Sequence, residues 1–145
     1  MAEAQESNQV EFELVSPERL LKSESVDMVV VPGAEGDFGV LPGHSPLIAT
    51  VRPGVIDIHE GGEVKESIFV AGGFAEVSTE RCTVLAEEAI PVDDIDKGAA
   101  EQRLEDAKAA KAQADEDAEG DAGAKAAADK ELLAAEAMLA AVPQS

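Results

Sequence analysis

The sequence predicts an α+β chain, in which an N-terminal all-β domain precedes a C-terminal antiparallel hairpin of two α-helices. Composition changes near Pro91: nine of the twelve glycines precede it, whereas alanine fills 18 of the 43 positions from Ala99 to Ala141. The spacing of apolar residues changes there too, from every second residue to every third or fourth, which marks a switch from strands to helices. We therefore expect a flexible N-terminus at residues 1–9, a β domain at 10–90 and a helical hairpin at 91–145.

Short alternating runs make up the β domain. Residues 10–14 alternate valine, phenylalanine and leucine with glutamate, which places the apolar side chains on one face of a strand. Other strand-like runs lie at 26–31, 56–58, 64–70, 74–78 and 82–87. Gly61-Gly62 joins two of them and predicts a tight hairpin turn, because glycine accepts the positive φ that such turns need. Seven or more short strands in about 80 residues are typical of a sandwich or a flattened barrel.

The alanine-rich half predicts helices at about residues 94–118 and 124–141, separated by a break at 119–123. Asp93 or Asp94 is expected to cap the first helix, because an aspartate side chain accepts hydrogen bonds from the unpaired N–H groups of the first turn. Few large side chains lie along the stripe where the helices meet. The hairpin therefore buries little apolar surface of its own and should need a partner surface.

Charge and aromatic content narrow the range of ligands. The net charge is −20 and only 3% of residues are aromatic, with no Trp or Tyr, so the chain lacks both the charge and the stacking surfaces of nucleic-acid binders. No run approaches the roughly 18 apolar residues that would span a bilayer, so direct membrane insertion is not expected. Cys82 is the one cysteine, and its strand-like surroundings predict a buried, unreactive thiol. Residues 1–7 are acidic and polar, unlike a secretory signal or transit peptide.

Two short motifs leave alternatives open. Gly43-His44-Ser45-Pro46-Leu47 partly matches the nucleophile elbow of hydrolases, but the closing glycine is missing. Residues 115–120 match the start of a calcium loop, yet the twelfth position, where a bidentate glutamate belongs, is Ala126. A hydrolase built around His44 and Ser45, and a free-standing sandwich that binds a ligand or calcium, therefore remain as alternatives to an interaction protein.

One glycine-rich run is far more specific than an ordinary turn. Residues 32–44 read Pro-Gly-x-Glu-Gly-x-x-Gly-x-x-Pro-Gly-His. Together with 15–18, 53–56, 70–77 and 83–89, this run resembles the ε subunit of bacterial F-type ATP synthases, in its alphaproteobacterial form. The resemblance implies a ten-stranded β sandwich. It also implies a non-catalytic rotor subunit of the central stalk, without a cofactor, which couples proton flow to ATP synthesis as a peripheral protein at the cytoplasmic face of the inner membrane.

The resemblance also implies contact residues. In the family the sandwich binds the γ subunit and rests on the ring of c subunits. Carried onto this sequence, Glu35, Gly36 and Asp37 would meet the polar loops of the c ring. Ser16 and His44 fall where the family's sandwich approaches γ.

The family's hairpin has a variable role. In many bacterial relatives it reaches the α and β catalytic subunits and blocks ATP hydrolysis, and some relatives bind ATP through Ile-Asp-x-x-Arg-Ala. This chain has Ala99 at the arginine position of that motif, so we expect no ATP site. The charged residues of the second predicted helix are Lys125, Asp129, Lys130, Glu131 and Glu136. Because acids outnumber bases there, we expect inhibition of hydrolysis to be weak or absent.

Overall fold

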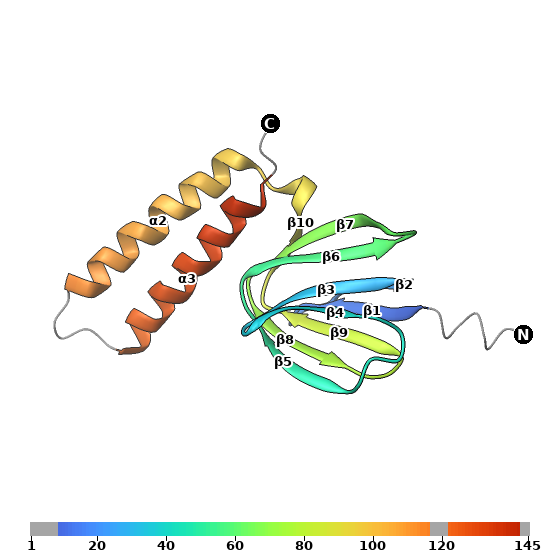
Figure 1. Cartoon of the computed structure of the whole chain (residues 1–145). Coiled ribbons are helices and arrows are strands. Elements are labelled where there is room, and N and C mark those ends of the chain that lie inside the picture. Colours follow the sequence, from blue (N-terminus) through green and yellow to red (C-terminus); the bar gives the residue numbers. More distant parts are fainter. Residues whose placement is uncertain (1–8, 117–121, 143–145) are drawn as a thin grey trace, which may run out of the picture.

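A computed structural model of the chain describes residues 9–116 and 122–142, so the expected flexibility of residues 1–9 falls almost wholly outside the described part. The described residues form ten strands followed by two helices (Figure 1). The strands are β1 (Val10–Val15), β2 (Leu20–Val26), β3 (Met28–Gly33), β4 (Gly36–Val40), β5 (Leu47–Val51), β6 (Gly54–Glu60), β7 (Glu63–Val70), β8 (Gly73–Val77), β9 (Arg81–Ala86) and β10 (Ala89–Pro91). A short 3-10 helix, η1 (Val92–Asp94), leads to α2 (Lys97–Glu116) and α3 (Ala122–Ala141).

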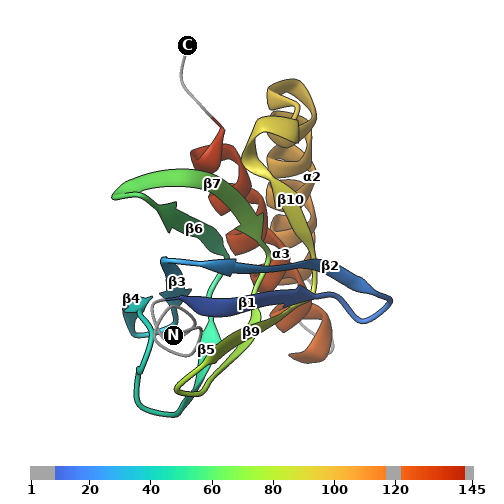
Figure 2. The same cartoon turned by 90° about the vertical axis from the view of Figure 1, so that its right-hand side faces the viewer.

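The ten strands hydrogen-bond into one sheet in the order β10-β7-β6-β3-β5-β8-β9-β1-β2, with β4 paired to β3. β1 runs parallel to β9 and antiparallel to β2. β3 changes partner along its length: Met28–Val30 pairs with β6, and Gly33 pairs with β5. The sheet therefore curls back on itself and encloses a core between its two halves (Figure 2). The expected ten-stranded sandwich followed by a helical hairpin is confirmed.

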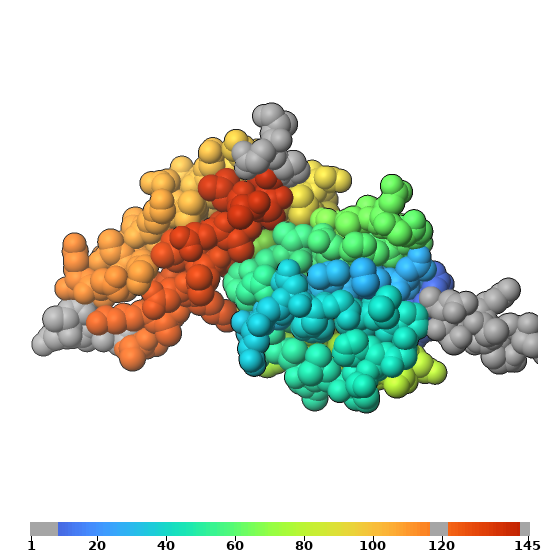
Figure 3. All heavy atoms as spheres, in the orientation of Figure 1, coloured from blue at the N-terminus to red at the C-terminus, as the bar shows by residue number. Residues whose placement is uncertain are grey.

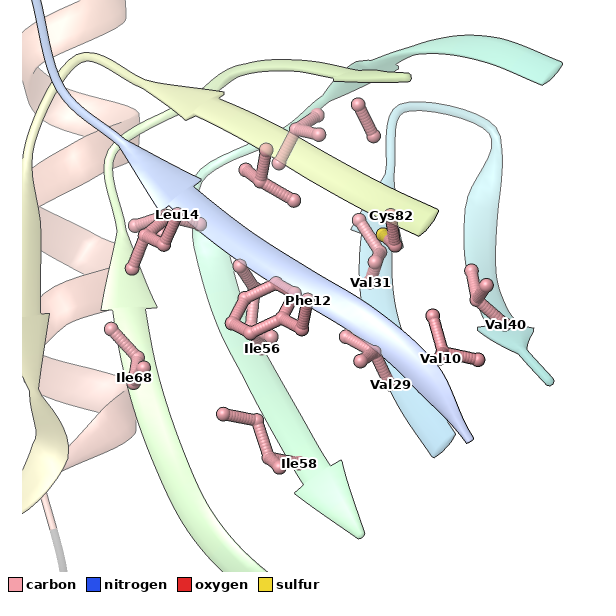
Figure 4. Close-up of a cluster of buried hydrophobic side chains, with 14 of the residues drawn as sticks. Val10, Phe12, Leu14, Val29, Val31, Val40, Ile56, Ile58, Ile68 and Cys82 are labelled. Atoms are coloured by element: carbon pink, nitrogen blue, oxygen red, sulfur yellow. The ribbon is translucent and has the colours of Figure 1, made fainter. Parts of the chain in front are cut away.

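The core lies between the two halves of the curled sheet. Phe12 at the centre of β1 is 0% exposed, and its neighbours two residues away, Val10 and Leu14, are 1% and 2% exposed. Figure 4 shows the labelled side chains of β1, β3 and β6 pointing into this shared space. Each such buried side chain stabilises the fold by roughly 1.5–3 kcal/mol. Cys82 belongs to this core, as expected, and burial raises the pKa of its thiol to about 12.

The hairpin packs on the outside of the sandwich, with α3 between α2 and the sheet (Figure 1), and Figure 3 shows the helices lying against it. On β7, Ile68 and Val70 point into the core, whereas Phe69 points outward and is 0% exposed because the hairpin covers it. The buried residues packed with Phe69 are Ala71, Ala100, Ala134, Met138 and Val142. The sandwich thus supplies the partner surface that the alanine-rich helices need.

Two local expectations were wrong. The strand-like run at 26–31 is not one strand: Val26 ends β2, the chain turns at Asp27, and β3 begins at Met28. The Asp27 carboxylate stabilises this turn by accepting a hydrogen bond from Gly61 N at 2.8 Å. That partner lies 34 residues away, so the local sequence gave no sign of this contact.

The start of the first helix also differs from the expectation. Asp93 and Asp94 lie in η1, and α2 begins only at Lys97, with the Asp96 carboxylate accepting from Ala99 N at 3.2 Å. Ile95, which follows η1, adopts an extended conformation, so α2 cannot begin before that point. At the other end, 117–121 lies outside the described residues and covers part of the calcium-loop candidate, while α3 already begins at Ala122.

Candidate interaction surfaces

Part of the outward face of β5, β8, β9 and β1 carries large exposed apolar side chains. The register places Thr50, Phe74, Leu85 and Val15 side by side in one row across these four strands. Phe74 and Leu85 are 57% and 51% exposed, and Ile48, one step along β5, is 74% exposed. A cluster of large exposed apolar side chains is typical of a surface that another protein covers. We call Ile48, Phe74 and Leu85 the apolar face.

Ser16 and His44 lie at opposite ends of the apolar face and do not come together. Ser16 directly follows β1, and its hydroxyl donates to the Arg19 carbonyl oxygen at 3.3 Å. His44 lies in the loop before β5, which Gly43 N ties to the Thr79 carbonyl oxygen at 2.8 Å. Both predicted γ contacts therefore border the same sheet face, a relationship that the sequence did not reveal.

The predicted c-ring contacts lie at the turn between β3 and β4. Glu35, Gly36 and Asp37 are all exposed. Gly33 and Gly36 face each other across the turn, and a Cβ on Gly33 would lie 2.6 Å from the Gly36 carbonyl oxygen. Only glycine fits there, which explains the first glycine of the motif.

Arg52 is a residue of this turn that the sequence analysis missed. Its guanidinium donates to the Asp37 carboxylate and to the Gly33 carbonyl oxygen, both at 2.6 Å. It lies 15 residues from Asp37, at the far end of β5, so no local pattern connects the two. The one available signal was its rarity, since the chain has only 11 Lys and Arg residues.

A groove of about 730 Å³ separates the apolar face from the hairpin. Phe74 and Leu85 line its sheet side, and Leu133 of α3, itself 57% exposed, lines the other. At its edge, Lys130 Nζ lies 2.6 Å from Glu87 Oε1 and joins α3 to the sandwich. The apolar surface therefore extends from the sheet toward the helices.

Arg103 joins both helices to the sandwich. Its guanidinium donates to both carboxylate oxygens of Glu88, at 2.9 and 3.0 Å, and to both of Glu131 in α3, at 2.7 and 3.0 Å. Hydrogen bonding to these carboxylates raises the pKa of Arg103, and its own hydrogen bonds hold the pKa of Glu131 below the ordinary value. No pattern in the sequence indicated this cluster, although Arg103 is the one arginine after Pro91.

The geometry does not favour the catalytic or metal-binding alternatives. The His44 ring bonds through Nδ1 to the main-chain carbonyl oxygen of Ser45, at 2.7 Å, and so it is not arranged as a base for the Ser45 hydroxyl. Within residues 9–116 and 122–142, no three His, Cys, Asp or Glu side chains are grouped to hold a metal ion. Neither described helix is long and apolar enough to cross a membrane.

Comparison with known proteins decides the family. The family model of the ATP synthase delta/epsilon chain β-sandwich domain matches residues 9–92. The ATP synthase epsilon chain of Paramagnetospirillum magneticum is 60% identical over 136 residues, which cover 94% of this chain and 98% of that one. This chain belongs to the ATP synthase delta/epsilon family. The Rhodospirillum rubrum epsilon chain, 55% identical, covers 90% of this chain and 94% of its own length.

Solved structures agree with this family. A chain in the Euglena gracilis mitochondrial ATP synthase (OSCP, F1 and c-ring) superposes with a TM-score of 0.75 at 27% identity, covering 92% of this chain and 81% of its own. A chain from the Tetrahymena thermophila mitochondrial enzyme shares the fold, with a TM-score of 0.60 at 14% identity, over 92% of this chain and 96% of its own. This family member is thus a non-catalytic rotor subunit of ATP synthase, and the hydrolase and ligand-binding alternatives are not supported.

Proposed function

We propose that this subunit binds γ through the apolar face and meets the c ring through the β3–β4 turn, at the cytoplasmic face of the bacterial inner membrane. The observation that carries the γ contact is the exposure of Phe74, Leu85 and Ile48 between the two predicted contact residues. Exposed apolar area of this kind favours association by roughly 25 cal/mol for each Å² buried. The acidic turn suits the basic and amide groups that the polar loops of c subunits present.

Two variants at similarly exposed apolar side chains, Phe74 and Val64, test the γ contact by co-purification. Phe74→Asp places a charge in the centre of the apolar face, and we expect it to abolish co-purification of the subunit with γ. Val64→Asp is the matched control, because Val64 is 51% exposed but lies on β7, away from this face. Retention of γ by Phe74→Asp would contradict the proposal, and so would equal loss of γ in both variants.

For the hairpin, we propose that it scarcely inhibits ATP hydrolysis. Three of its cations already pair with acids of this chain: Arg103 with Glu88 and Glu131, Lys130 with Glu87, and Lys111 with Asp129. They are therefore not free to meet acidic segments of the α and β subunits. We expect deletion of residues 93–145 to change the hydrolysis rate of the assembled complex less than about twofold, or under 0.5 kcal/mol of activation free energy. A many-fold rise would contradict this expectation.

A further inference from the structure

We propose that Arg52 positions the β3–β4 turn by pairing with Asp37. The carboxylate of Glu35 then stays unpaired among the described residues and meets the polar loop of a c subunit. This inference rests on the c-ring contact proposed above. It goes beyond that contact because it assigns different roles to the two acids: Asp37 holds the turn in place, and Glu35 meets the partner.

The guanidinium of Arg52 bridges the two sides of the turn. Gly33 ends β3 and Gly36 begins β4, so only Ala34 and Glu35 lie between the paired strands. Arg52 Nη1 donates to the Gly33 carbonyl oxygen before the turn, and Nη2 donates to Asp37 Oδ1 after it. A planar group with several fixed donors can hold two acceptors at once, which a lysine ammonium does less well. The side chain thereby limits rotation of the turn about the β3–β4 axis.

The backbone on both sides of this contact is also held. Arg52 N donates to the Pro32 carbonyl oxygen at 2.9 Å, and Ala34 N donates to the Thr50 carbonyl oxygen at 2.8 Å. These bonds join the end of β3 to the end of β5. Because the main chain of Arg52 is anchored next to the turn, only its side chain must be ordered for the guanidinium to reach Asp37.

The same contact separates the charges of the turn. Asp37 is neutralised by Arg52, whereas Glu35 is exposed and makes no ion pair within the part of the chain that the structure describes. The turn therefore presents one negative charge rather than two. A single carboxylate at a fixed place can select a matching donor on the partner, and loss of Arg52 would leave two like charges on a less restrained turn.

Cross-linking within the complete membrane-bound ATP synthase tests this role. Ala34→Cys places an exposed thiol beside Glu35 without removing the carboxylate, and the buried native Cys82 does not compete for reaction. The measurement is the yield of disulfide to a cysteine introduced in the polar loop of the c subunit. In this background we expect Arg52→Gln to lower the cross-linking yield about fivefold. This is the effect of losing about 1 kcal/mol, the upper range for a half-exposed ion pair. Arg52→Lys should restore part of the yield.

Arg81→Gln is the matched control. Arg81 is also an exposed arginine with carboxylate partners, Glu11 and Glu13, but it lies on β9, away from the turn. Its removal should leave the yield unchanged. Within the Ala34→Cys background, equal yields with Arg52→Gln and with Arg52 intact would overturn the inference. It would also be overturned if Arg81→Gln lowered the yield as much as Arg52→Gln does. Should Arg52→Gln not assemble, Asp37→Asn breaks the same ion pair, and an undiminished yield there would overturn it.

This experiment distinguishes the c-ring contact from the positioning role of Arg52. If Ala34→Cys with Arg52 intact forms no cross-link, the proposed c-ring contact is itself wrong. If that cross-link forms and does not depend on Arg52, the contact stands and only the positioning role fails.

Discussion

Replacing Arg103 by glutamine removes a charge that contacts both helices of the hairpin and the sandwich. The side chain of Arg103 is 24% exposed, and its partners Glu88 and Glu131 are 37% and 45% exposed. Glutamine retains much of the length and polarity but can bond only one carboxylate. The substitution therefore leaves the two glutamates close together without a cation between them.

The magnitude follows from this geometry. Hydrogen bonds to charged groups contribute about 1.5–3 kcal/mol each when buried, but solvent screening reduces exposed ion pairs to under about 1 kcal/mol. With the guanidinium mostly buried and both carboxylates partly exposed, we expect a total loss of about 1–2 kcal/mol. Since about 1.4 kcal/mol is a tenfold change, the equilibrium constant for docking of the hairpin on the sandwich should fall roughly 5- to 30-fold.

Spin labels on the sandwich and on α3 would measure this change. Glu76→Cys and Glu136→Cys are exposed positions for the two labels, and the fraction of molecules at long label separation reports undocked hairpin. Lys108→Gln is the control, since Lys108 is 57% exposed and, among the described residues, pairs with Glu105 alone, at 3.9 Å. An Arg103→Gln variant with the distance distribution of the parent protein would refute the reasoning, and so would an equal shift in Lys108→Gln.

Three further predictions concern the core and the hairpin. Phe69→Ala removes a side chain that is 0% exposed between sandwich and hairpin, and it should lower the free energy of unfolding by about 3–5 kcal/mol in urea titrations; a loss below about 1 kcal/mol would be inconsistent with its burial. Cys82, with its thiol pKa near 12, should react with alkylating reagents at pH 8 only after unfolding, and rapid labelling of the native chain would contradict this. Because the pKa of Glu131 is lowered from 4.5 in the folded protein, its stabilising contribution is present above pH 4.5 and is lost as pH falls through the lower folded value. Carboxyl NMR titration should show this lowered midpoint, and Arg103→Gln should raise it toward 4.5; an identical midpoint in both proteins would exclude the ion pair as the cause.

Local patterns sufficed for most of the strands and for the order of the two halves. The alternation in β1 put Phe12 in the core, and positive φ at Gly61 and Gly62 agrees with the hairpin turn expected there. Where a local pattern was ambiguous, the expectation was wrong. Apolar residues on both sides of Asp27 made 26–31 resemble a single strand. Three aspartates within four residues of the first helix offered more than one possible cap.

Contacts between distant residues were outside the reach of such patterns. Arg52 and Asp37 meet because β5 lies beside the end of β3, and Arg103 meets Glu88 because the hairpin folds back over the sandwich. Neither neighbour relationship is encoded in spacing along the chain. Both depend on strand order and helix docking, which are set by the packing of the whole molecule.

The sequence by itself determined which segments are strands and which are helices, and which strand positions carry apolar side chains. It also carried the resemblance that led to the family. Only the tertiary structure decided which apolar side chains are covered. Phe69 and Phe74 both point out of the sheet, yet the hairpin covers Phe69 and leaves Phe74 57% exposed. Alternation specifies a face, but burial also requires another element to pack there, and that element comes from a distant part of the chain.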